Sequence, residues 1–199
     1  MSKKRIAILT GGGDVPGLNP AIRAVTVRAL REGYEVVGLR RGWAGVIDIV
    51  REKDYDNSNN FQHLSEEIVN RAGRTGGTFL HTSRTRPSTV KADAVPEHLK
   101  GQYRGPTNDL TPEVLKNLDW LGVDHLIPIG GDDTLSYAVR LHKEGVKVIA
   151  IRDFGGLFTE PRICGDAVSM ASERDPHRDE KLQQIVPVVG RIESVYVVR

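Results

Sequence analysis

The sequence predicts an α/β fold with a doubly wound, mostly parallel sheet and helices on both faces. Two observations predict it. Short apolar runs alternate with amphipathic segments as far as residue 151, which is the pattern of repeated β-α-β units. Glycine-rich turns with aspartates also follow two of the apolar runs, where parallel strands lead into helices. We therefore expect one α/β domain over residues 1–151, followed by a divergent tail over 152–199.

The composition fits one soluble domain and excludes several classes of protein. Of the 199 residues, 39% are hydrophobic and 27% are charged, and no apolar run approaches the ~18 residues of a membrane span. The net charge of +2 is too balanced for a duplex-DNA binder that works by bulk electrostatics. The single cysteine, Cys164, excludes an intrachain disulfide and a cysteine-based zinc site. No secretory signal follows the basic start, so we expect a cytoplasmic protein with neither membrane nor nucleic acid as partner.

The first β-α-β unit is predicted over the opening residues. The apolar run Arg5–Leu9 suits a buried parallel strand. Asn19 is a suitable N-cap for the next helix, with Pro20 at its first position. Gly33 ends that helix, and Glu35–Leu39 forms the second strand.

Polar and proline-bearing segments separate this unit from a second one. Between the units we predict a surface excursion at 51–62, a helix starting at 65–67, a strand at 78–82 and a loop at 84–107. The second unit comprises a helix over 111–121, a strand at 125–129, a helix from 135 ended by Gly145, and a strand at 147–151. In the tail, only 185–189 and 192–198 have the composition of strands.

Two turns carry the candidate chemistry, Gly11–Asp14 and Gly130–Thr134. In an open α/β sheet both lie at the carboxyl edge of the strands, where ligands bind. Glycines let backbone N–H groups approach phosphate oxygens, and carboxylates there suit a Mg²⁺ ion between protein and phosphate. Ordinary turns are the alternative interpretation. The turns match neither the dinucleotide fingerprint nor a Walker loop.

Three segments resemble the 6-phosphofructokinase family, in family order and spacing. They are Ile8–Asn19 (ILTGGGDVPGLN), Gly73–Leu80 (GRTGGTFL) with the later Arg84, and Ile129–Thr134 (IGGDDT). The resemblance covers roughly residues 3–151, about the first half of a family member. It implies phosphoryl transfer to the 1-hydroxyl of fructose 6-phosphate, Mg²⁺ as cofactor and, for a full-length protein, a homo-oligomer.

The resemblance also assigns site residues. It implies that Gly12 and Asp14 lie beside the phosphoryl donor, with Arg84 contacting its phosphates and Asp132 associated with Mg²⁺. Gly131 and Thr134 belong to the same donor-binding motif, and Trp43 matches a family aromatic residue beside the donor, although a packing role is equally expected. Arg71, Arg74 and Arg86 could extend a phosphate-binding patch or lie in solvent.

Position 133 separates two branches of the resembled family. ATP-using members typically carry glycine there, whereas aspartate resembles the pyrophosphate-dependent branch. A carboxylate beside an α-phosphate adds bulk and like-charge repulsion, and pyrophosphate has no such group. Asp133 therefore favours pyrophosphate as the donor, with ATP as the alternative.

The chain departs from the family pattern after Ile151. The family continues with an Asp-Asn-Asp segment whose first aspartate is the catalytic base, but this chain continues Arg152-Asp153-Phe154 and contains no Asp-Asn-Asp. Asp153 is the weak candidate that remains for the catalytic base. We also expect the second family domain to be absent. A frameshift, a truncation or a deliberate change would each produce such a break.

The leading interpretation is the donor-binding half of a pyrophosphate-dependent phosphofructokinase that lacks full catalytic competence. The alternatives are an ATP-dependent member, a protein similar to the NAD or lipid kinases, and a non-catalytic phosphate-binding remnant. The first motif argues against the NAD or lipid kinase alternative, and the missing Asp-Asn-Asp segment supports the remnant.

Overall fold

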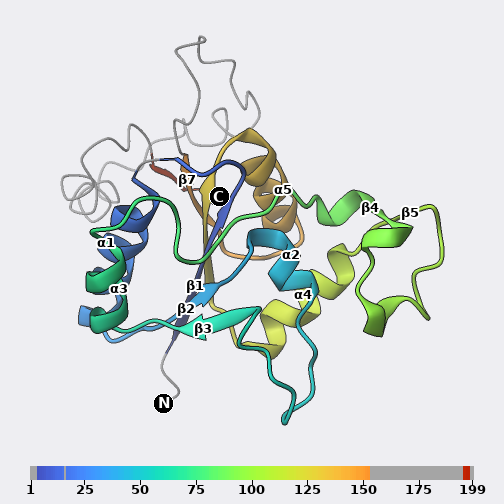
Figure 1. Ribbon diagram of the computed structural model, residues 1–199, viewed down its shortest axis with the longest axis horizontal. Helices are drawn as coiled ribbons and strands as arrows, with labels where there is room; N and C mark the ends of the chain where they lie inside the picture. The colour runs from blue at the N-terminus through green and yellow to red at the C-terminus, as the bar shows by residue number, and fades with distance from the viewer. Residues whose placement is uncertain (1–3, 16, 153–194, 198–199) are drawn as a thin grey trace.

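A six-stranded, mostly parallel sheet forms the centre of the molecule (Figure 1). The computed structural model describes residues 4–15, 17–152 and 195–197. The strand order is β3-β2-β1-β6-β7-β8, with β1, β2, β6 and β7 parallel and both edge strands antiparallel. The strands are β1 Arg5–Gly11, β2 Glu35–Leu39, β3 Phe61–His63, β6 His125–Gly130, β7 Ile149–Arg152 and β8 Val195–Val197. This topology confirms the predicted fold class.

Helices cover both faces of the sheet, with α1 and α3 on one side and α2, α4 and α5 on the other (Figure 1). They are α1 Leu18–Arg31, α2 Gly42–Ile47, α3 Glu66–Ala72, α4 Thr111–Trp120 and α5 Asp132–Lys143. None of these helices, which are all those described, is long and apolar enough to cross a bilayer.

Strand β1 shows why the sheet needs both helical layers. Ala7 and Leu9 pack into the core beneath α2, α4 and α5, whereas Ile8 packs into the core beneath α1 and α3. All three side chains are fully buried. The continuous apolar run therefore forms a central parallel strand, as expected when successive side chains point to opposite faces.

The segment between α3 and α4 contains short elements only. These are the paired strands β4 Val90–Lys91 and β5 Thr107–Asn108 and the 3₁₀ turns η1 Pro87–Thr89, η2 Ala92–Ala94 and η3 Glu97–Leu99. The predicted strand at 78–82 is wrong. His81 adopts a left-handed φ of 58°, which breaks an extended strand.

Two local predictions at helix starts also need correction. Helix α1 begins at Leu18 with Gly17 as its N-cap and no capping side chain, so Asn19 lies inside the helix. Helix α2 was not predicted, because it has only six residues, two of them glycine. Its N-cap, Arg41, and its first residue, Gly42, are both left-handed, with φ of 56° and 55°.

Most of the predicted tail, including 185–189, lies outside the described residues. Strand β8 falls within the predicted strand at 192–198 and pairs with β7.

Candidate phosphate-binding site

The two predicted glycine turns lie side by side at the carboxyl edge of the sheet. Strands β1 and β6 are parallel neighbours, with Gly11 in register with Gly130. A Cβ atom added to Gly12 would lie 3.9 Å from the backbone nitrogen of Gly131. The structure thus brings together two motifs more than a hundred residues apart in the sequence.

Thr134 packs beneath these turns and explains two of the glycines. Its side chain is buried, at 3% exposure. A Cβ on Gly130 would lie 3.0 Å from the Thr134 Cβ, and a Cβ on Gly11 would overlap the Thr134 hydroxyl. In this structure the Thr134 side chain packs closely against both turns, and its contact with a donor stays a prediction.

The start of helix α5 offers backbone N–H groups at this edge. No side chain caps the helix, and its first internal hydrogen bond runs from the Leu135 N–H to the Gly131 carbonyl at 3.1 Å. The N–H groups of Asp132, Asp133 and Thr134 precede that bond and have no partner within the helix. Together with the positive end of the helix dipole, they favour a phosphate group.

A third segment, from the region after α3, lies along the first turn. The Gly12 N–H donates to the Ser83 carbonyl at 3.1 Å, and the Thr82 hydroxyl donates to the Gly12 carbonyl at 2.8 Å. The Gly12 amide is therefore already bonded within the protein. Glycine is favoured at position 12 by the left-handed φ of 92°.

Arg84 follows directly after the residues bonded to Gly12. Its side chain is exposed and makes no hydrogen bond or ion pair with any other described residue. A guanidinium that is not engaged within the protein can form two parallel hydrogen bonds with a phosphate. The structure thus places the predicted arginine beside the first turn, with its charge uncompensated by any residue that the structure describes.

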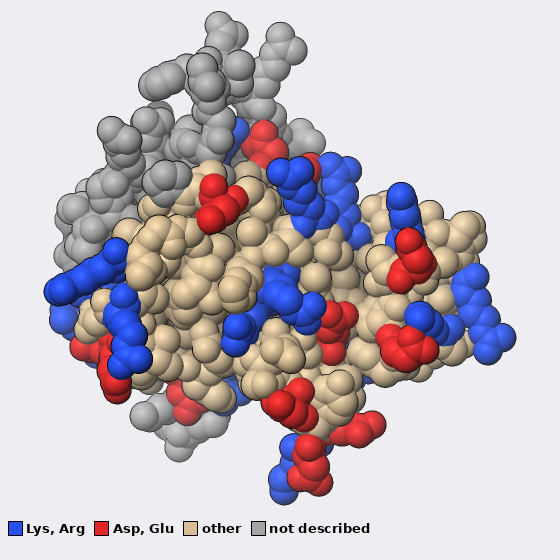
Figure 2. All heavy atoms as spheres, viewed as in Figure 1, with Lys and Arg blue, Asp and Glu red and all other residues tan. Residues whose placement is uncertain are grey.

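Each aspartate of the second turn is paired with a different arginine. Asp132 Oδ1 lies 3.0 Å from Arg152, and Asp133 Oδ1 lies 2.6 Å from Arg86. In Figure 2, basic and acidic side chains lie next to one another over the start of α5. Arg71, by contrast, pairs with Glu67 on α3 at 3.3 Å and does not join this cluster.

These residues fit a Mg²⁺ ion only when phosphate oxygens complete its coordination. Among the described residues, no three His, Cys, Asp or Glu side chains gather as metal ligands. Asp132 is 61% exposed and offers one carboxylate at the phosphate-facing turn. Mg²⁺ in phosphate sites commonly takes one or two carboxylates and completes its shell with phosphate and water. Asp132 would exchange its contact with Arg152 for that ion.

Asp14 lies on the exposed part of the first turn, facing a second glycine loop. A Cβ on Gly77 would lie 3.0 Å from Asp14 Oδ2, and Gly77 has a left-handed φ of 76°. The loop containing Gly77 is the second of the segments that carried the family resemblance. The structure therefore joins all three segments at one edge of the sheet.

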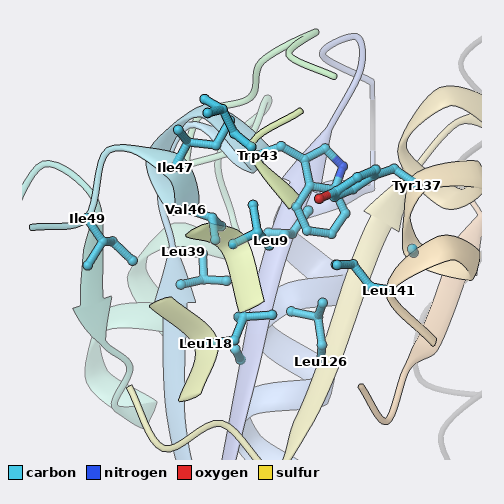
Figure 3. Close-up of a cluster of buried hydrophobic side chains, with 14 of the residues drawn as sticks. Leu9, Leu39, Trp43, Val46, Ile47, Ile49, Leu118, Leu126, Tyr137 and Leu141 are labelled. Atoms are coloured by element: carbon cyan, nitrogen blue, oxygen red, sulfur yellow. The ribbon is translucent and has the colours of Figure 1, made fainter. Parts of the chain in front are cut away.

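Trp43 lies in the core beneath α2, α4 and α5, and not on the surface of the site (Figure 3). Its side chain is 2% exposed and packs edge-to-face on Tyr137, with ring centroids 4.9 Å apart. A buried indole in such a pair is a packing residue, so this geometry does not support donor contact by Trp43.

Asp153, the candidate base, lies outside the described residues. The sequence did not identify Asn19 and Arg152 as residues of the candidate site. Nothing in local patterning marks them, because Asn19 contacts residues 56 to 60 positions away and Arg152 contacts Asp132 across the sheet edge.

Comparison with known proteins identifies a family for this chain. The family model described as Phosphofructokinase matches residues 5–153. The chain is 35% identical over 202 residues to a pyrophosphate–fructose 6-phosphate 1-phosphotransferase of Dictyoglomus thermophilum, covering 96% of this chain and 50% of that protein. It is 37% identical over 201 residues to an ATP-dependent 6-phosphofructokinase of Streptococcus pyogenes serotype M5 (strain Manfredo), covering 94% and 50% respectively.

Solved structures support the fold. Phosphofructokinase of Pichia pastoris in the T-state aligns with a TM-score of 0.55 at 17% identity, covering 75% of this chain and 14% of that one. Phosphofructokinase of Saccharomyces cerevisiae aligns with a TM-score of 0.52 at 24% identity, covering 75% and 20%. The chain spans about half the length of the curated relatives it matches. On the family match, and on three motifs that meet at one edge of a parallel sheet, the chain belongs to the phosphofructokinase family.

Proposed function

We propose that this chain binds the phosphoryl donor of a phosphofructokinase reaction, and that the donor is pyrophosphate. In that reaction a P–O bond of pyrophosphate breaks, and a new P–O bond forms to the 1-hydroxyl oxygen of fructose 6-phosphate. Inorganic phosphate leaves, and the hydroxyl proton passes to a base. The product is fructose 1,6-bisphosphate.

The arrangement of charge at the sheet edge supports donor binding. Arg84 is uncompensated by any described residue, and the α5 N–H groups lie beside the first turn. Phosphoryl transfer needs positioning and charge neutralisation more than covalent chemistry from the protein. Mg²⁺, when bound with the donor, would supply further charge neutralisation, with Asp132 as its protein ligand.

Asp133 is the single observation that carries the choice of pyrophosphate. Its carboxylate lies in the first turn of α5 and is 75% exposed, and the resemblance to the family implies that the α-phosphate of ATP would lie beside this position. The ion pair with Arg86 at 2.6 Å offsets part of the charge of Asp133. Selection against ATP would therefore depend on the bulk of this ion pair as well as on charge repulsion. Relatives with each donor in their names match at similar identity, which keeps ATP as the second candidate.

Replacement of Asp133 tests the choice of donor. We expect Asp133→Gly to strengthen ATP binding relative to pyrophosphate by about tenfold or more, since removal of a carboxylate near a phosphate relieves about 1–2 kcal/mol of repulsion. Calorimetric titration of both ligands measures the ratio, with Asp119→Asn on an exposed face of α4 as control. An unchanged ratio would remove Asp133 as the selectivity residue.

The acceptor and the assembly follow from the family and remain part of the proposal. Fructose 6-phosphate would bind next to the donor, and a full-length protein would form a homo-oligomer. The missing Asp-Asn-Asp segment favours donor binding without turnover in this chain, and the remaining candidate is a phosphate-binding remnant that serves no phosphofructokinase reaction.

A further inference from the structure

Asn19 makes an unusual set of contacts for a residue in the first turn of a helix. It is 1% exposed, and its side chain points away from α1 to the loop after α3. Its amide nitrogen lies 3.1 Å from both the Thr75 carbonyl and the Thr75 hydroxyl, and 3.3 Å from the Gly76 carbonyl. Its amide oxygen accepts from the Phe79 N–H at 2.8 Å. One buried side chain thus satisfies both ends of the segment Thr75–Phe79.

Two further side-chain contacts continue this attachment toward the site. The Thr10 hydroxyl, at the end of β1, lies 3.0 Å from the Thr78 hydroxyl and donates to the His81 carbonyl at 2.9 Å. Further along the segment, the Gly12 N–H donates to the Ser83 carbonyl, and the Thr82 hydroxyl donates to the Gly12 carbonyl. The segment from Thr75 to Ser83 is therefore fixed at three successive places, to Asn19 of α1, to Thr10 of β1 and to Gly12 of the first turn, and Arg84 comes next.

The same segment also lies next to the carboxylate of Asp14, in the first glycine turn. Gly77, between the residues that Asn19 holds, is so close to Asp14 that a Cβ atom would lie 3.0 Å from its carboxylate oxygen. Displacement of the segment would therefore move the surroundings of Asp14 together with the base of Arg84.

We propose that Asn19 is a positioning residue for donor binding, which holds Thr75–Phe79 against the first glycine turn and thereby sets the approach of Arg84. The inference rests on the proposed donor-binding function. Its basis is the buried amide, whose donor and acceptor groups are both used by one segment. Replacement would remove the donor of the part-buried hydrogen bonds to the Thr75 and Gly76 carbonyls, and hydrogen bonds left unmade around a buried side chain are costly.

Asn19→Asp is the sharpest variant, because it keeps the shape and the acceptor for the Phe79 N–H. It replaces the donating NH₂ by an oxygen that faces the Thr75 and Gly76 carbonyl oxygens. We expect at least tenfold weaker pyrophosphate binding in a chain that still unfolds cooperatively. Should this variant fail to fold, Asn19→Ser, which keeps a short hydroxyl, takes its place.

Thr26→Val is the matched control on the same helix. The Thr26 hydroxyl is fully buried and has no hydrogen-bond partner among the described residues, so its removal changes a buried polar group without touching the segment. We expect pyrophosphate binding within twofold of the original chain.

Hydrogen exchange at the Phe79 amide separates positioning from general stability. In Asn19→Ala we expect this amide to lose protection while amides of β1 keep theirs. Unchanged exchange at Phe79, or unchanged pyrophosphate affinity in Asn19→Asp, would overturn the proposal, as would equal weakening in Thr26→Val. If the original chain binds no pyrophosphate, the proposed function fails, whereas the exchange measurement still decides whether Asn19 holds the segment.

Discussion

Asp132 and Asp133 are adjacent residues with different surroundings. Asp132 faces Arg152 at the end of β7, and Asp133 faces Arg86 from the segment before η1. Both carboxylates are mostly exposed, and ion pairs in such surroundings contribute about 0–1 kcal/mol. Neither ion pair is therefore so strong that a metal ion could not take the place of the arginine at the carboxylate.

Asp132 gives the residue-scale prediction. We expect Asp132→Ala to weaken Mg²⁺-dependent pyrophosphate binding by about tenfold, because the turn loses its metal-facing carboxylate. Titration of pyrophosphate with and without Mg²⁺ measures this difference. If the mutant keeps the full Mg²⁺ dependence, Asp132 is a turn residue that pairs with Arg152 and nothing more.

At the scale of elements, helix α4 is connected to two irregular segments through one buried carboxylate. Glu113 is 1% exposed and lies 2.8 Å from both Arg51 and Lys116, with the Tyr103 hydroxyl donating to it at 3.3 Å. Burial by itself raises the pKa of Glu113, but the hydrogen bonds and charges of Lys116 and Arg51 outweigh it and hold the pKa below the usual 4.5. This network keeps the segments around Arg51 and Tyr103 packed against α4.

Removal of the Glu113 charge should therefore destabilise the fold in a pH-dependent way. We expect Glu113→Gln to lower the free energy of unfolding by about 2 kcal/mol at pH 7. A lowered folded-state pKa gives stability that is present above the unfolded value and lost as pH falls through the folded value. The difference between the chains should thus shrink below about pH 4.5.

Urea unfolding at several pH values checks this prediction. Asp119→Asn, an exposed change on the same helix, should stay within about 0.5 kcal/mol of the original chain. If the difference in the free energy of unfolding between Glu113→Gln and the original chain stayed constant from pH 7 to pH 3, it would contradict the lowered pKa of Glu113.

The elements that the sequence could predict are those specified locally. Apolar runs and glycine stops were enough for β2 at Glu35–Leu39, and Ser65 caps α3 through the Ile68 N–H as its sequence indicates. Helix α2 depends instead on tertiary contacts. A Cβ on Gly45 would overlap the Arg40 carbonyl oxygen, and no local pattern indicates such a constraint.

The residues of the candidate site likewise fall into those specified by local sequence and those that depend on tertiary contacts. Its glycines and aspartates could be predicted because they follow strands in recognisable motifs. The contacts of Asn19 could not, because an asparagine at a helix start is ordinarily an N-cap, whereas the partners of its side chain lie in another loop. The arginine partners of Asp132 and Asp133 likewise depend on how β7 and the 83–87 segment meet α5.

At the scale of the whole molecule, the sheet brings the groups proposed to bind the donor to one edge, and no base is assigned among the described residues. The chain contains no Asp-Asn-Asp segment, and a general base typically contributes 10²–10⁴-fold in rate. We therefore expect pyrophosphate binding without appreciable turnover of fructose 6-phosphate. An assay of fructose 1,6-bisphosphate formation by the purified chain checks this prediction. Formation at ordinary enzyme rates would instead implicate a tail carboxylate, which Asp153→Asn would then test.

Direct titration of the purified 199-residue chain with pyrophosphate and with ATP, each in the presence of Mg²⁺, tests the central claim most directly. From the geometry of the two glycine turns, Arg84 and Asp133, we predict saturable binding. One pyrophosphate should bind per chain, and it should bind more tightly than ATP. Tighter binding of ATP would contradict the choice of donor, and no binding of either ligand would contradict the proposed phosphate site itself.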